Sequence, residues 1–243
     1  MKTIITHILK YVLFKYCYVY DMILYMKLKD KIEIPKYNLC EELLSAISHG
    51  VGGLLSIAAL VLCTVFSAIH HNVYAVISSV IYGSCSIILY TMSTLYHSFK
   101  PNNAKRVFRI LDHDSIFLLI AGTYTPYALV SLPKALGWTV FGVIWGCAIL
   151  GITLNSINLN KYKKFSMFLY LVMGWMIIFT FKTLLNSIDI AGIYLMLSGG
   201  IIYTIGAIFY AVGKKKKYMH SIFHFFVLAA SILFFFSIFL YVI

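Results

Sequence analysis

The sequence predicts an all-α integral membrane protein: a seven-transmembrane-helix bundle with its N-terminus cytoplasmic and its C-terminus extracytoplasmic. Of the 243 residues, 61% are hydrophobic, and the mean hydropathy is +0.89. Such a chain has too few polar residues to cover a soluble globule. Apolar stretches of spanning length and an uneven distribution of basic residues are the other two observations.

Residues 1–40 are expected to form an N-terminal extension outside the bundle. Their apolar run over residues 4–26 is interrupted by two lysines and Asp21, which makes a spanning helix costly. Two interpretations stay open. The segment is an interfacial helix on the membrane surface, or it precedes a true start at Met22 or Met26.

Seven apolar stretches follow from residue 41 onward, each about 20 residues long, which is the length that a helix needs to cross a bilayer. The loops between them are short, so one membrane domain is expected over residues 41–243. The stretches run roughly over residues 46–69, 73–97, 113–132, 135–156, 165–185, 190–212 and 219–242.

The basic residues set the predicted orientation. Of the 20 Lys and Arg residues, 18 lie before the first stretch or in the second, fourth and sixth loops. Cytoplasmic loops carry such an excess, so these four segments are expected on the cytoplasmic side of the cell membrane. The net charge of +12 therefore indicates topology. A nucleic-acid partner is not expected, because such proteins carry their basic residues on a folded surface with interleaved aromatics.

This topology brings five histidines and four carboxylates to one face at comparable depth. His220 and His224 begin the last stretch four residues apart, and Ser93 and His97 end the second stretch at the same spacing. Residues four apart share a helical face. Ionisable groups inside a membrane are costly, and by default they mark a functional site.

The simplest chemistry for this cluster is a Zn2+ ion held by His97, His220 and His224, because a catalytic zinc takes three protein ligands and keeps one position for water. Zinc makes water acidic enough to ionise near neutral pH. Asp112 would then act as a general base, and Ser93 would orient the water or a substrate oxygen. The expected reaction is hydrolysis of a buried ester or amide.

Each of these residues also has a purely structural interpretation. His220 and His224 suit an interfacial position facing lipid headgroups. Ser93 suits a hydrogen bond to its own i−4 carbonyl, and Asp112 suits a helix N-cap or a pairing with Arg109.

Three further polar residues share one face of the first span at three- and four-residue spacing. Glu42, Ser45 and His49 either support the metal ligands as a second shell or form a hydrogen-bond network between helices. His113 and Asp114 are expected to face headgroups or to cap a helix.

Four motifs, in this order, resemble those of the hemolysin III family, the bacterial branch of the superfamily that includes the progestin and adipoQ receptors. They cover about residues 41–243. They are Glu42 to Gly50 of the form E-x-x-N-x-x-x-H-G with Ser45 in place of Asn, Ser93 to His97, Leu111-Asp112, and His220 to His224.

The resemblance implies a seven-helix fold with zinc at the cytoplasmic side, bound by His97, His220 and His224, with Asp112 close to the metal. For the receptor branch it implies a ceramidase-like hydrolase of lipid amides, and for the bacterial branch a pore-forming cytolysin. A receptor or sensor with structural zinc is the third alternative. The composition speaks against a secreted toxin, which needs a soluble form, so the hydrolase is favoured.

Overall fold

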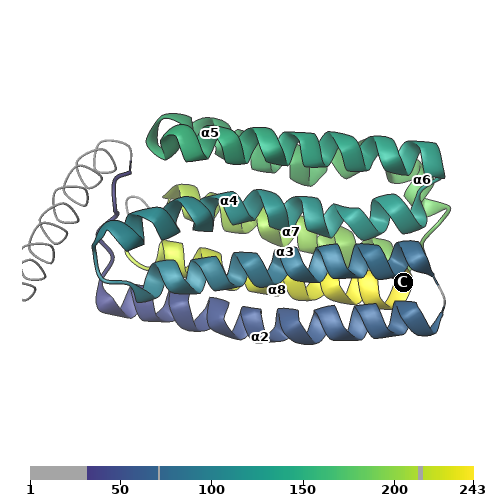
Figure 1. The fold of residues 1–243 in the computed structure, drawn as a ribbon, viewed down its shortest axis with the longest axis horizontal. Helices are drawn as coiled ribbons and strands as arrows, with labels where there is room; N and C mark the ends of the chain where they lie inside the picture. Colours follow the sequence, from purple (N-terminus) through teal and green to yellow (C-terminus); the bar gives the residue numbers. More distant parts are fainter. Residues whose placement is uncertain (1–31, 71, 213–215) are drawn as a thin grey trace, which may run out of the picture.

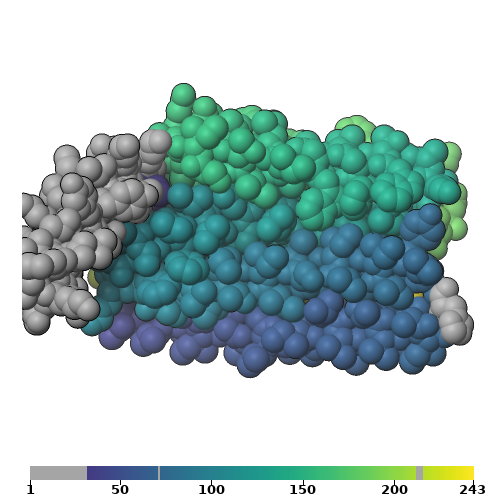
Figure 2. Space-filling view, viewed as in Figure 1, coloured from purple at the N-terminus to yellow at the C-terminus, as the bar shows by residue number. Residues whose placement is uncertain are grey.

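A computed structural model describes residues 32–70, 72–212 and 216–243, and all the secondary structure in these ranges is helical. The expectations for residues 1–31 lie outside the described residues. The long helices run side by side along one axis (Figure 1). Helices α5, α4, α3 and α2 lie next to one another on the face that Figure 2 presents. The elements are α2 (Leu39–Ile69), α3 (Val73–Ser98), α4 (Asn103–Pro126), the π-helix η1 (Tyr127–Ser131), α5 (Lys134–Trp175), the 3₁₀-helix η2 (Met176–Thr180), α6 (Phe181–Leu185), α7 (Ile190–Val212) and α8 (Met219–Tyr241).

Asparagine side chains fix where three of the helices begin. Asn38 and Glu41 form a reciprocal capping box at the start of α2. Asn72 accepts from the Ala75 amide at α3, and Asn102 accepts from the Lys105 amide at α4. Such caps satisfy backbone donors that the first turn of a helix leaves unpaired. Helices α2 and α4 therefore begin about seven and ten residues before the apolar stretches that predicted them.

Helix α5 reverses direction at Asn158, whose backbone angles are not helical. The Asn158 side chain caps the returning arm by accepting from the Lys161 amide. Ser166 donates a 2.6 Å hydrogen bond to Asn155, although eleven residues of straight helix would separate them by about 16 Å. The two arms of α5 therefore lie against each other; the first covers the expected stretch 135–156, and the second, continued by η2 and α6, covers 165–185.

Five helices among the described residues are long and apolar enough to cross a membrane, where the sequence predicts seven spans. One of the five is the continuous helical run over residues 134–185, which includes both arms of α5. Helix α4 is not among them, because its first half carries five charged side chains, from Lys105 to Asp114. Side chains on the outer face of α2, such as Leu54 and Val61, are exposed, as they would be against lipid.

The apolar core lies towards the end of the bundle away from the first turns of α2 and α8. Phe117, Ile144, Met173 and Ile238 are among its fully buried members. The buried hydroxyl of Tyr127 donates to Ser237 at 2.7 Å. Such pairing is required where no water is available to backbone or side-chain polar groups. The opposite end carries the ionisable groups.

Candidate metal centre

Three histidines from two helices meet at one end of the bundle. His97 comes from the last turn of α3, and His220 and His224 come from the first turns of α8. Each of the three side chains is buried. The Nε2 atom of His220 lies 3.3 Å from that of His97 and 3.0 Å from that of His224. The expected histidine cluster is therefore present, with all three Nε2 atoms turned inward.

The spacing of the nitrogen atoms fits a small divalent metal. Tetrahedral zinc with Zn–N bonds of about 2.0–2.1 Å places its ligand atoms about 3.3 Å apart. These three histidines are the group among the described residues whose ligand atoms can hold a metal ion. Imidazole nitrogens suit zinc, although they also suit copper, iron and nickel.

The hydrogen bonds at the far side of two of the rings bear on the tautomer that metal binding requires. His97 directs its Nδ1 at the Glu42 carboxylate, 2.6 Å away, so this nitrogen carries the proton and Nε2 keeps its lone pair. His224 directs its Nδ1 at Nε2 of His49, 2.9 Å away. When His224 is the donor in this contact, its Nε2 is left free for a metal. Fixing the ring orientation through the second nitrogen is typical of metal-ligating histidines.

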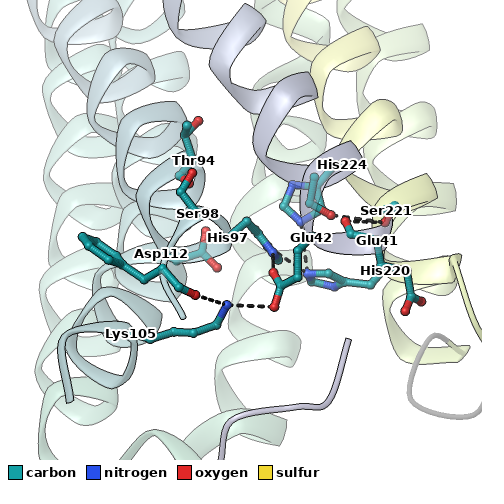
Figure 3. A network of polar contacts seen from close by, with 12 residues as sticks. Glu41, Glu42, Thr94, His97, Ser98, Lys105, Asp112, His220, Ser221 and His224 are labelled. Carbon is teal, nitrogen blue, oxygen red and sulfur yellow. Dashed lines mark hydrogen bonds and ion pairs between the residues drawn. The ribbon is translucent and has the colours of Figure 1, made fainter. Parts of the chain in front are cut away.

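Glu42 also holds a buried lysine. Its second carboxylate oxygen accepts a 2.7 Å bond from Lys105 Nζ, and the same ammonium donates to the Phe99 carbonyl. Lys105 is only 1% exposed. Figure 3 shows Glu42 between Lys105 and His97, with His220 and His224 beyond. A carboxylate thus joins the ligand His97 to a buried cation.

Ser45 is placed differently from the other two residues that were expected to support the ligands. Its hydroxyl contacts Ser221 at 3.2 Å, and Ser221 donates to the Glu41 carbonyl. Ser45 therefore ties α2 to α8 beside His220 without touching an imidazole. Glu42 and His49, by contrast, each contact a ligand histidine directly.

Asp112 and Ser93 face each other beside the cluster. Asp112 lies in the middle of α4 and is buried, so an N-cap role for it is wrong, because Asn102 caps that helix. The Ser93 hydroxyl is directed at the Asp112 carboxyl, but its oxygen makes no hydrogen bond of good geometry with a described residue. Several other hydroxyls on α3, among them Thr94, bond back to the i−4 carbonyl, whereas Ser93 does not.

His113 and Asp114 do not face headgroups, contrary to expectation. His113 contacts the Tyr210 hydroxyl at 3.2 Å, and Asp114 accepts from Ser156 on α5. Both side chains are buried within the protein. Helix α4 begins early enough to carry them inside the bundle.

Tyr37, which sequence patterns do not predict as part of the site, covers the cluster from the segment before α2. Its ring stacks on His220 with centroids 4.7 Å apart and planes 9° apart. Burial raises the pKa of the Tyr37 phenol well above its ordinary value, so the hydroxyl stays protonated. No local pattern marks such a residue. Lys105 and Arg109, by contrast, could have been placed at the site from the sequence. They precede Asp112 by seven and three residues, a spacing that puts all three side chains on one face of a helix.

An apolar cavity of about 170 Å³ leads away from the histidines. Asp112, His220 and His224 line its polar end. The lining residues of α4 extend from Asp112 to Tyr124, about 18 Å of helix. The remaining walls are mostly apolar side chains of α5, α7 and α8, including Met167, Leu197 and Phe234.

Comparison with known proteins agrees with these motifs. A family model described as "Haemolysin-III related" matches residues 37–235. The chain belongs to the hemolysin III family. The match covers most of the chain, and it confirms the resemblance drawn from the four motifs.

Members of the hemolysin III family align over most of their own length. "Hemolysin-3" of Bacillus cereus is 42% identical over 202 residues, which are 83% of this chain and 92% of that protein. "Hemolysin-3 homolog" of Bacillus subtilis (strain 168) is 40% identical over 205 residues, which are 84% of this chain and 96% of that protein. The human "Monocyte to macrophage differentiation factor" is 29% identical over 170 residues, which are 68% of this chain and 70% of that protein. This more distant similarity supports the wider superfamily to which the motifs pointed.

The family and the apolar helices together make this chain a multi-pass protein of the cell membrane. The polar cluster of a hemolysin III protein is thus buried at one end of a membrane bundle. There it offers three imidazole nitrogens to a metal ion.

Proposed function

We propose that this hemolysin III protein is a zinc-dependent intramembrane hydrolase of lipid amides or esters. The observation that carries the proposal is the position of the three-histidine cluster, two members of which, His220 and His224, line an apolar cavity. A long acyl chain suits the cavity walls, and the bond to be cleaved would then lie beside the histidines. A catalytic site of this kind needs both a metal and room for the substrate.

The proposed reaction uses the three histidines and the polar residues beside them. A zinc ion held by His97, His220 and His224 supplies Lewis acidity, which activates water towards a carbonyl carbon. Asp112 accepts the proton of the attacking water and returns it to the leaving amine or alkoxide. The Ser93 hydroxyl donates a hydrogen bond to a substrate or water oxygen. Glu42 and His49 hold the imidazoles of His97 and His224 in the required tautomer.

The proposed topology has seven spans with the metal centre on the cytoplasmic side. Helix α4 counts as a span despite its charges, because Lys105, Arg109 and Asp112 are buried against other helices and do not meet lipid. Each arm of α5 counts separately, since the chain folds back at Asn158. The basic residues of the second, fourth and sixth loops would then all lie in the cytoplasm.

A second candidate is a pore-forming cytolysin, favoured by the name "Hemolysin-3" that the Bacillus cereus relative carries. Membrane lysis requires no metal-activated water. The two functions therefore differ in whether they depend on Asp112 and the histidines.

The deciding experiment compares His220→Ala and Asp112→Asn with the unaltered protein in detergent. Bound zinc, turnover of ceramide and lysophospholipid, and lysis of red cells are measured together. We expect His220→Ala to lose the metal. We expect Asp112→Asn to keep the metal and lose at least about 100-fold in turnover, the usual contribution of a general base.

The control is His70→Ala, which removes an exposed imidazole that contacts only the carbonyl and the ring of Phe66 in its own helix end, among the contacts of the described residues. It should leave metal content and turnover unchanged. Red-cell lysis that survives both site variants would replace the hydrolase by the cytolysin. A zinc-loaded protein that turns over no lipid would indicate a receptor or sensor in which the metal is structural.

A further inference from the structure

A buried arginine beside the metal centre lacks partners for two of its donor atoms. Arg109 is 3% exposed, and its Nε and Nη1 make no hydrogen bond with a described residue. Among the described residues it also forms no ion pair within 4.0 Å. Burying a guanidinium without hydrogen bonds is costly. Such a group is normally balanced by an anion.

Two hydroxyl groups of α3, the helix that packs against α4, are likewise buried without a hydrogen-bond partner among the described residues. Ser93 and Tyr96 of α3 are at most 1% exposed, and neither hydroxyl oxygen has a hydrogen-bond partner in the described part of the chain. Arg109 lies within electrostatic reach of Tyr96 and of Asp112. The two helices thus bring a cation and two neutral donors together. The Arg109 atoms Nε and Nη1 and the Tyr96 hydroxyl have no acceptor among the described residues, and the Ser93 hydroxyl is only directed at Asp112 without a hydrogen bond of good geometry.

The neighbouring carboxylates do not supply the missing acceptor. Glu42 is engaged by His97 and Lys105. Asp112 is within electrostatic reach of Arg109, but the two make no ion pair. When a divalent cation occupies the histidines, the single charge of Asp112 cannot balance both the metal and the guanidinium. A further negative group would reduce the excess of positive charge.

The cluster adjoins the cavity of the metal centre. Arg109 lies one turn before Asp112 on α4, and it is within electrostatic reach of Tyr210 and His220. Asp112, Tyr210 and His220 all line the polar end of the cavity. An amphiphile whose chain occupies the apolar part would therefore place its charged head near Arg109.

We propose that Arg109, with the Tyr96 and Ser93 hydroxyls, forms a binding site for the oxyanion of a lipid, a carboxylate or a phosphate, whose chain lies in the cavity. The guanidinium offers the planar pair of donors that matches such oxyanions. The inference rests on the proposed function for the location of the chain. It adds that the preferred lipid carries a negative charge next to the metal.

The test compares three amphiphiles with one brominated chain and different heads: 9,10-dibromostearate, 9,10-dibromostearyl phosphate and the neutral 9,10-dibromostearyl alcohol. Bromine quenches tryptophan fluorescence on contact, and Trp175 lines the cavity. Titration of the zinc-loaded protein in a neutral detergent gives an affinity for each. Trp175→Phe identifies the share of quenching that comes from the cavity. This readout requires no turnover, so it stands even if no lipid is hydrolysed.

We expect at least one charged amphiphile to bind about tenfold or more tightly than the alcohol, since a hydrogen bond to a charged group is typically of this size. Arg109→Gln should abolish that preference and leave the affinity for the alcohol and the bound zinc unchanged. Lys164→Gln, which removes an exposed charge of α5, is the matched control and should retain it. Tyr96→Phe keeps the ring, so it provides a milder variant if Arg109→Gln does not fold. Tyr96→Phe should lower the affinity for the charged amphiphiles and leave the affinity for the alcohol unchanged.

The three heads and two free anions distinguish the possible sources of the oxyanion. Tighter binding of the carboxylate assigns the site to fatty acids or acyl products, and tighter binding of the phosphate assigns it to phosphate-bearing headgroups. Acetate or inorganic phosphate that displaces the charged amphiphiles at millimolar concentration would assign the site to a free anion and overturn the lipid assignment. Equal affinity for all three heads, or a preference that survives Arg109→Gln, would overturn the site itself.

Discussion

At the scale of single residues, the candidate metal centre depends on which ring nitrogen of each histidine carries a proton. Glu42 and His49 each contact Nδ1 of a ligand histidine, and Tyr37 stacks on the third ring. Each of the three rings thus contacts a different kind of group: a carboxylate for His97, an imidazole for His224 and an aromatic ring for His220. The carboxylate is the strongest of these, because its bond to His97 is charge-assisted.

Replacing Glu42 should therefore weaken the metal site without removing a ligand. Glu42→Gln keeps the size of the side chain, but it takes the negative charge from His97 and from the buried Lys105. Loss of such a supporting carboxylate typically lowers metal affinity about 10- to 100-fold. Competition with a zinc chelator in detergent measures the change.

The matched control is Glu33→Gln, because Glu33 is exposed and forms its hydrogen bond through the backbone amide. This variant should hold zinc like the unaltered protein. If Glu42→Gln did so too, Glu42 would be only a partner for Lys105.

The histidines were predictable because helical spacing places residues four apart on one face, and the topology then brings the ends of helices together. The position of Tyr37 was not predictable, because Tyr37 lies in a non-helical segment and contacts His220, which is 183 residues away in the chain. The sequence pattern indicates Lys105 and Arg109 as topology signals, with Arg109 also a possible partner for Asp112. Basic side chains near the end of a span ordinarily reach for water; here packing of α3 against α4 keeps them inside.

At the scale of elements, the apolar stretches predicted which segments are helices, while the caps decided where they begin. Asn38 and Asn102 extend α2 and α4 into polar sequence, a signal that hydropathy alone does not include. The fold-back of α5 depends on Asn155, Asn158 and Ser166. Their meeting is tertiary and leaves no periodic pattern in the sequence.

Close packing of α2 on α3 depends on a glycine. A Cβ atom at Gly83 would lie 2.6 Å from Leu60 Cβ and 2.8 Å from its Cα, so the backbone of α2 would have to move. Small residues allow such close approach of membrane helices. Gly83→Ala should cost about 1–3 kcal/mol of stability, as overpacking usually does. The unfolding temperature in detergent measures the loss.

Gly142→Ala provides the comparison within the same chain, because a Cβ atom there meets nothing within 4 Å. This change should be neutral or slightly stabilising, since alanine favours helix over glycine. Equal unfolding temperatures for the two variants would mean that α2 and α3 can separate at little cost.

At the scale of the whole molecule, polarity is divided along the bundle axis. The buried ionisable side chains Glu41, His97, Arg109 and His220 lie at one end, and the apolar core lies towards the other. Of the basic segments, the described loop between α3 and α4 and the reversal of α5 lie at the ionisable end (Figure 1). This arrangement is the basis for assigning that end to the cytoplasm, since cytoplasmic loops carry the excess of Lys and Arg.

The orientation and the number of spans can be tested together with alkaline phosphatase fusions in bacteria. The enzyme is active only outside the cytoplasm, where its disulfides form. Seven spans with a cytoplasmic amino terminus predict active fusions after residues 133 and 243 and an inactive fusion after residue 164. Residue 133 follows α4, and residue 164 lies just beyond the reversal of α5 at Asn158. An inactive fusion at 133 would show that α4 does not cross the membrane, and activity at 164 would place the reversal outside. The opposite pattern at all three positions would invert the protein and move the metal centre to the outer face.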